Sequence, residues 1–243
     1  MSDATYKLGR LPARFPGGLY ELSYYVAGSL PIPPTSIPLP KVTNWGMLGN
    51  DQYGDCGPAG FIHGCEADAA ITHQKENWPT AQEVINGYLA YTHGQDAGVI
   101  LSDFLSYVRM QPKGFCGHKL TAYAPINHLD TTMLRTAIWM YDFIYTGIAV
   151  TDAMMQAAQS GQPWTLADLH SPVAGGHCVP VVAYDEHWLY LVTWGSIQKV
   201  SYPMWSQICD EAWVVITEEF VKAGGDWHGV SLKALEADLN RLG

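Results

Sequence analysis

The stretch that decides the fold is GNDQYGDCGPAGFIHGCEAD, residues 49 to 68, which places Cys56 between a glycine-rich turn and an apolar run. The run predicts a helix over residues 57 to 72, with the cysteine at its first turn. The helix dipole and the unsatisfied N–H groups stabilise negative charge there, which favours a thiolate. Gly54 and Gly57 would let a substrate carbonyl approach the backbone closely. Cys56 is either a nucleophile or a small buried residue, and its partner must decide between the two.

The composition limits the classes of protein to consider. The chain has 243 residues, 48% hydrophobic and 15% charged, with a formal net charge of −10. This predicts one large globular domain, or at most two small ones, rather than a disordered chain. The negative charge disfavours nucleic acid as a partner, since phosphate would be repelled. We also expect no membrane span, because no run approaches the roughly 20 apolar residues that one requires.

The cysteines and the N-terminus bear on location and cofactors. MSDATYKLGRLPARF has no apolar run of the kind found in secretory signals, so we expect cytoplasmic synthesis, with which incorporation into a virion is compatible. Five cysteines, an odd number without a CxxC pair, indicate free thiols rather than a disulfide framework. No His–Cys spacing repeats as in a zinc site, and we expect no metal and no cofactor.

Residues 1 to 43, the N-terminal arm, contain PARFPGG and SLPIPPTSIPLP. Proline at this density removes backbone donors and favours extended structure. We therefore predict an extended arm that lies across the surface of a main domain at residues 44 to 243. The alternatives are an inhibitory pro-segment and an arm that docks on a neighbouring subunit.

The hydrophobic period changes along the main domain. Its first part has helical spacing, with a capping box at Thr80 and Glu83 and a cap at Asp130. Its second part has short β-branched or aromatic runs, and the chain ends with an amphipathic helix capped by Ser231. Helices followed by antiparallel strands predict an α+β fold. The expected helices are 57–72, 80–93, 102–110, 130–142 and 231–242, and the expected strands are 143–150, 177–184, 188–194, 197–202 and 212–217.

His177 is the best candidate for the base that Cys56 needs. A thiol requires such a partner near neutral pH, and histidine is the usual one. AGGHCVPVV places His177 after two glycines at the mouth of a hydrophobic strand, at the edge of an expected cleft. His63 lies one to two turns further along the cysteine's own helix, and from there it cannot easily turn back to the sulfur.

DCGPAG at a helix start, then GGHCVPVVAYD, then WLYLVTWGS, resemble in this order the three signatures of the papain-like cysteine peptidase superfamily. Over nearly the whole chain, the arm, NWGMLGNDQYGDC, GQPW, GGHCVPVV and VTWG look similar to poorly characterised papain-like proteins of actinobacteria and their phages. The resemblance implies a papain-like fold, with a helical half that bears the cysteine and an antiparallel β half. It also implies that Cys56 is the nucleophile and His177 the general base.

The remaining site residues depart from the papain pattern. Asn50 stands where papain relatives have the glutamine of the oxyanion hole, and Gln52 follows two residues later; either amide could donate alongside the Cys56 N–H. Alignment on the Trp-Gly pair puts Val192 at the position of the third catalytic residue, whereas counting from His177 points to Thr193. Valine cannot hydrogen-bond an imidazole, but a threonine hydroxyl can. Asp185 is a third possibility if the chain folds back.

Two classes of function follow. The first is a cysteine hydrolase, a peptidase or amidase that acts on a peptide or related amide through an acyl-enzyme. The second is a structural or binding protein with a papain-like fold, for instance a phage virion component that docks other subunits through its arm. A fold alone does not choose between them. We expect the acidic residues Asp210, Glu211, Glu218 and Glu219 to be solvated surface.

Overall fold

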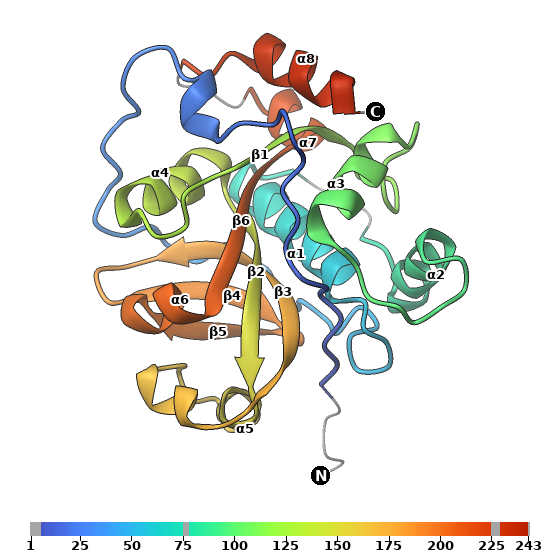
Figure 1. Ribbon diagram of the computed structural model, residues 1–243, viewed down its shortest axis with the longest axis vertical. Helices are drawn as coiled ribbons and strands as arrows, with labels where there is room; N and C mark the ends of the chain where they lie inside the picture. The colour runs from blue at the N-terminus through green and yellow to red at the C-terminus, as the bar shows by residue number, and fades with distance from the viewer. Residues whose placement is uncertain (1–5, 75–77, 225–228, 243) are drawn as a thin grey trace.

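A six-stranded antiparallel sheet, in the order β1-β6-β2-β3-β4-β5, is the framework of the computed structural model (Figure 1). The structure describes residues 6–74, 78–224 and 229–242. The central strands are buried along most of their length, which explains their runs of valine, isoleucine and aromatic residues. The strands are β1 Leu120–Pro125, β2 Ile144–Thr151, β3 Val173–Tyr184, β4 Trp188–Thr193, β5 Ser196–Ser201 and β6 Cys209–Thr217.

Helix α1, Cys56–Ile71, is buried on nearly every side and packs against β3. A small residue allows this close approach, because a Cβ on Gly60 would lie 3.2 Å from the Cys178 sulfur on β3. Helices α2 and α3 both contact α1, and α3 also packs against β1 (Figure 1). The other helices are α2 Ala81–Tyr91, α3 Leu101–Met110, α4 Thr131–Tyr141, α5 Asp152–Gln159, α6 Tyr202–Ile208, α7 Glu218–Lys222 and α8 Leu232–Leu242, with 3-10 helices η1 Leu22–Tyr25 and η2 Leu166–His170.

The α+β class is confirmed, and most expected elements are present within a few residues. β1 was not expected: LTAYAP has alanine and proline at strand positions, and only pairing with β6 makes it a strand. The short helices α5, α6 and α7 were also missed. Each begins directly after a strand, at Thr151, Ser201 or Thr217, whose side chain caps the helix.

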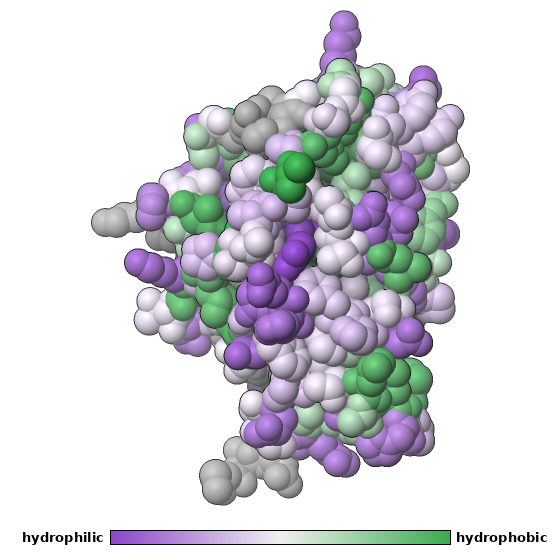
Figure 2. Space-filling model, turned by 90° about the vertical axis from the view of Figure 1, so that its left-hand side faces the viewer, coloured by the Kyte–Doolittle hydropathy of each residue, from purple (hydrophilic) through white to green (hydrophobic). Residues whose placement is uncertain are grey.

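The described part of the N-terminal arm has two segments that behave differently. Residues 6 to 11, here the cleft segment, run between the start of β3 and the loop before α3: the Arg10 N–H donates to the Gly176 carbonyl, and the Leu11 N–H donates to the Val99 carbonyl. Residues 27 to 43, here the surface segment, pass around the outside of the domain near α4. Figure 2 faces this side and shows hydrophobic residues in separate patches among hydrophilic ones. Within the described ranges, no helix has both the length and the apolar character needed to cross a membrane.

Candidate active site

Cys56 is the first residue of α1 and is almost completely buried, with 1% of its surface exposed. Asp55 precedes the helix but makes no side-chain cap, so it leaves the first N–H groups free for another acceptor. The backbone N–H of Cys178 donates to the Cys56 sulfur at 3.4 Å. This contact brings the sulfur next to the backbone of His177, the residue before Cys178.

His177 is the fifth residue of β3, whose start at Val173 is four residues earlier than the sequence predicts. Its Nε2 atom lies 2.6 Å from the Thr193 hydroxyl, at the end of β4. Trp194 stacks on the imidazole with ring centres 4.5 Å apart. The other nitrogen, Nδ1, is buried and has no hydrogen-bond partner among the residues that the structure describes. The ring is therefore held by Thr193 and Trp194 through one nitrogen and one face.

The protonation of the pair follows from burial. Burial raises the pKa of Cys56 to about 12, and hydrogen bonds from the backbone of Cys178 and Gly9 only partly oppose this rise. Burial also lowers the pKa of His177 to about 3, and the positive charge of Arg10 adds to the effect. Near neutral pH the structure therefore holds an uncharged thiol and an uncharged imidazole rather than an ion pair.

The two candidate oxyanion-hole amides lie in different environments. Asn50 is buried beside Asp55, and its amide donates to the Tyr53 carbonyl at 3.3 Å. Burial raises the pKa of Asp55 to about 8, and the Asn50 side chain partly offsets this. The Gln52 side chain is exposed. Of the two, Asn50 is the amide built into the wall of the site, although one of its N–H groups serves the turn.

The alternatives considered from sequence occupy other positions. Asp185 accepts hydrogen bonds from the N–H groups of His187 and Trp188 and from the Tyr190 hydroxyl, so it shapes the β3–β4 turn. Val192 is buried in the core. His63 lies 3.0 Å from the Trp45 carbonyl through Nε2, and burial lowers its pKa to about 4. Of the three candidates Val192, Thr193 and Asp185, Thr193 is the one that contacts His177.

The cleft segment occupies the space in front of Cys56. The Gly9 N–H faces the sulfur, and a Cβ on Gly9 would lie 1.7 Å from the Gly54 carbonyl oxygen. Val99 donates to the Gly9 carbonyl at 2.8 Å and accepts from the Leu11 N–H at 2.8 Å. The Lys7 carbonyl accepts from the Trp194 indole at 3.2 Å. This part of the arm is therefore an extended segment inside the site, joined to Val99 by a single parallel bridge at Arg10. A groove of about 320 Å³ runs along it, so it does not simply lie on the outer surface.

The expectation that the acidic residues are all solvated is wrong for Glu211 and Glu219, which are buried. The Glu211 carboxylate is fully covered and pairs with Arg10 at 2.8 Å. The sequence did not indicate Arg10, and it placed Glu211 at the surface. A signal was present, because Glu211 is in phase with the buried residues Trp213 and Val215 on β6, where an acidic side chain requires a partner.

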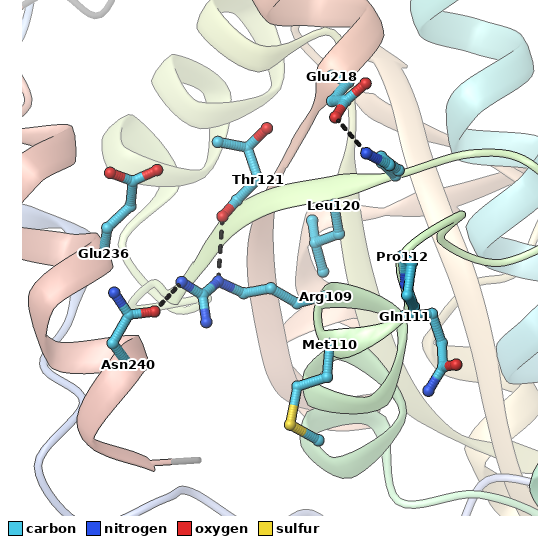
Figure 3. A pocket seen from close by; sticks show the side chains of 10 residues that line it. Arg109, Met110, Gln111, Pro112, Leu120, Thr121, Glu218, Glu236 and Asn240 are labelled. Atoms are coloured by element: carbon cyan, nitrogen blue, oxygen red, sulfur yellow. Dashed lines mark hydrogen bonds and ion pairs between the residues drawn. The ribbon is translucent and has the colours of Figure 1, made fainter.

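A separate pocket of about 440 Å³ lies between α3, β1 and α8 (Figure 3). Its arginine, Arg109, donates to the Thr121 carbonyl and to Asn240, and its lysine, Lys119, pairs with Glu218 at 3.1 Å. Both positively charged side chains are therefore already paired with other residues of the protein. None of the candidate catalytic residues lines this pocket.

The chain resembles solved cysteine proteases in structure. Xylellain, a cysteine protease from Xylella fastidiosa, superposes with a TM-score of 0.67 at 13% identity, over 89% of this chain and 98% of its own. The cysteine protease and lectin-like domains of Cwp84, a surface layer associated protein of Clostridium difficile, give a TM-score of 0.55 at 10% identity, over 88% of this chain and 56% of theirs. The sequence matches no family model and no curated protein. At these identities the likeness concerns the fold: the chain has the fold of papain-like cysteine proteases.

Proposed function

We propose that the chain is a cysteine hydrolase of peptide or related amide bonds, held at rest by its own N-terminal arm. The observation that carries the proposal is the His177 ring, with Nε2 bound to Thr193 and Nδ1 unpartnered among the described residues, one residue before Cys178, whose N–H donates to the Cys56 sulfur. A core histidine would satisfy both nitrogens. One nitrogen oriented and the other free is the arrangement that general base catalysis requires.

The reaction follows from these groups once the cleft segment leaves. His177 takes the thiol proton, and the Cys56 thiolate attacks the carbonyl carbon of the amide. The oxyanion receives hydrogen bonds from the Cys56 N–H and from the Asn50 or Gln52 amide. The C–N bond breaks as His177 returns the proton to the leaving amine. A water molecule, deprotonated by His177, then attacks the thioester, which releases the acid and restores the thiol.

The arm supports a resting state, because it excludes both water and substrate. The arm turns the Gly9 N–H, and not a carbonyl carbon, toward the sulfur. The Gly9 carbonyl is itself bound to Val99. The arm therefore fills the site without offering a bond to cleave, as an inhibitory pro-segment would.

The competing function is a structural or binding protein, including the phage virion component that the resemblance to actinobacterial and phage proteins implies. The observation in its favour is that Cys56 and His177 are both buried and uncharged. In that case the cleft segment would be a permanent part of the core. The two functions differ in whether the arm can leave.

The test uses the full chain with Gly9→Leu, which places a side chain where Gly54 leaves no room. We expect this variant to hydrolyse dye-labelled denatured casein. Cys56→Ala in the same background should lose all hydrolysis, whereas Cys116→Ala, at a half-buried thiol away from the site, should lose none. Thr193→Ala should lower kcat roughly ten- to hundredfold and leave KM nearly unchanged, because it only orients the base.

Hydrolysis that persists without Cys56 would assign the activity to another group. If Gly9→Leu frees the thiol for alkylation but no casein is cleaved, the structural function is the better description.

A further inference from the structure

Arg10 lies in an acidic pocket beside the candidate active site. Its guanidinium makes a two-point contact with Asp210, with Nη1–Oδ1 at 2.6 Å and Nη2–Oδ2 at 2.7 Å. Nη1 also donates to Glu211 at 2.8 Å. The arginine side chain is 5% exposed and the glutamate side chain is fully buried. This is a fork-shaped recognition of a guanidinium, in which geometry as well as charge selects the side chain.

The pocket is shaped for a long side chain by two glycines and held in place by a tryptophan. A Cβ on Gly147 would lie 2.7 Å from both Cδ and Nη1 of Arg10, and one on Gly176 would lie 3.2 Å from its Nε. The Trp213 indole donates to the second oxygen of Glu211 at 2.8 Å. Oε2 of Glu211 is therefore bound within the sheet, and Oε1 faces the guanidinium of Arg10. Because Trp213 and Glu211 are both on β6, the sheet fixes the orientation of the Glu211 carboxylate.

The pocket lies one residue away from the nucleophile along an extended peptide. Arg10 donates its backbone N–H to the Gly176 carbonyl at 3.1 Å, directly before His177. The adjacent residue, Gly9, faces the Cys56 sulfur. The peptide groups of Gly176 and Val99 thus hydrogen-bond an extended peptide from both sides, as in the addition of a strand to a sheet edge.

We propose that the acidic pocket formed by Asp210 and Glu211 is a substrate subsite for an arginine side chain, which Arg10 of the arm occupies in the resting protein. The proposal rests on the proposed function. A substrate has to present a carbonyl to Cys56, which the arm does not do, so it runs opposite to the arm. Its arginine then immediately precedes the residue that forms the acyl-enzyme.

The charge of the site supports a cationic ligand over an apolar one. A buried carboxylate without a partner is strongly unfavourable, and the arm satisfies it with Arg10. Asp210 is half exposed, with 49% of its side chain accessible, so the outer end of the pocket is open to solvent. An apolar side chain would leave Glu211 without a counter-charge and would leave the Asp210 fork empty.

The experiment compares arginine with citrulline, which has nearly the same shape and no charge. The full chain with Gly9→Leu is assayed on acetyl-Arg-Gly-aminocoumarin, acetyl-citrulline-Gly-aminocoumarin and acetyl-Gly-Arg-aminocoumarin. We expect kcat/KM to be roughly 10- to 100-fold higher for the first than for either of the others. Glu211→Gln and, separately, the more exposed Asp210→Asn should each reduce that preference, with folding checked by thermal unfolding.

A binding measurement tests the same subsite without requiring hydrolysis. Fluorescein-labelled peptides with the sequence of residues 6 to 15, carrying either arginine or citrulline at the position of Arg10, are titrated against Gly9→Leu/Cys56→Ala. Arginine should bind at least about tenfold more tightly, and Glu211→Gln should remove the difference.

The outcomes separate the two proposals. Hydrolysis without an arginine preference, or with a preference for acetyl-Gly-Arg-aminocoumarin, overturns the subsite and leaves the hydrolase. Tight binding of the arginine peptide without any hydrolysis supports the pocket and overturns the hydrolase. Equal binding of the two peptides with no hydrolysis overturns both.

Discussion

The two segments of the N-terminal arm have similar extended backbones but contact the domain in different ways. The cleft segment is paired on both sides by backbone hydrogen bonds and inserts Arg10 into a buried acidic pocket. The surface segment has isolated contacts, such as the Ile37 N–H to the Tyr184 carbonyl at 3.0 Å, and leaves Ile32 88% exposed. Extended structure alone does not decide whether an arm docks. The cleft segment docks because it forms a buried charge pair and has backbone hydrogen bonds on both sides.

The strongest test of this difference between the two segments is a variant that displaces the cleft segment from its site. In Gly9→Leu the added side chain collides with the Gly54 backbone, so we expect iodoacetamide to alkylate Cys56 at least about 100-fold faster than in the unmodified chain. Gly17→Leu is the matched control, because no atom lies within 4 Å of its Cβ position. Peptide mass mapping identifies the alkylated thiol. Equal rates in the two variants would mean that the cleft segment does not protect Cys56.

The pH profile of alkylation sharpens the same point. In the resting protein the pKa of Cys56 is raised to about 12 by burial, so the thiolate fraction, and with it the rate, should still be rising at pH 10. Gly9→Leu restores solvent to the site and lowers this pKa. Its rate should therefore level off at a lower pH. The measurement is the rate of iodoacetamide incorporation between pH 6 and 10, and superimposable profiles would contradict the explanation.

Arg10→Ala tests the charge pair that anchors the cleft segment. Removal of one partner leaves the Glu211 carboxylate buried and uncompensated, which costs up to about 3–5 kcal/mol unless the segment undocks. We expect a lower melting temperature and faster alkylation of Cys56. Arg14→Ala is the control, because Arg14 pairs with Asp103 at the surface, where such pairs contribute little. A larger loss of thermal stability in Arg14→Ala would reverse our ranking of the two sites.

The smallest effect is expected in the surface segment. Ile32→Ser removes an exposed side chain that is not part of the buried core. Both the alkylation rate of Cys56 and the melting temperature should stay within experimental error of the unmodified chain. A clear drop in either would show that the surface segment also holds the arm in place.

Local sequence determined the main elements of the fold and the two most important residues of the candidate site. Helical spacing after DCG, capping residues such as Thr80 and Asp130, and β-branched runs specify helices and strands through contacts within a few residues. The order of the cysteine and histidine signatures, by resemblance, pointed to Cys56 and His177. Thr193 could be named as one of three candidates only, because the choice depends on how β3 and β4 pair.

Tertiary structure alone decided what meets in the cleft. Strand β1 exists because β6 pairs with it, and the contact between Thr193 and His177 follows from the β3–β4 hairpin. Gly9 and Arg10 are distant in sequence from Cys56 and from Glu211, and no local pattern in LGR indicates a docking site. Their positions depend on close fit and on the high cost of an unpaired buried charge. Both are properties of the assembled interior, so the sequence by itself predicted an extended arm, and the folded domain determined where it binds.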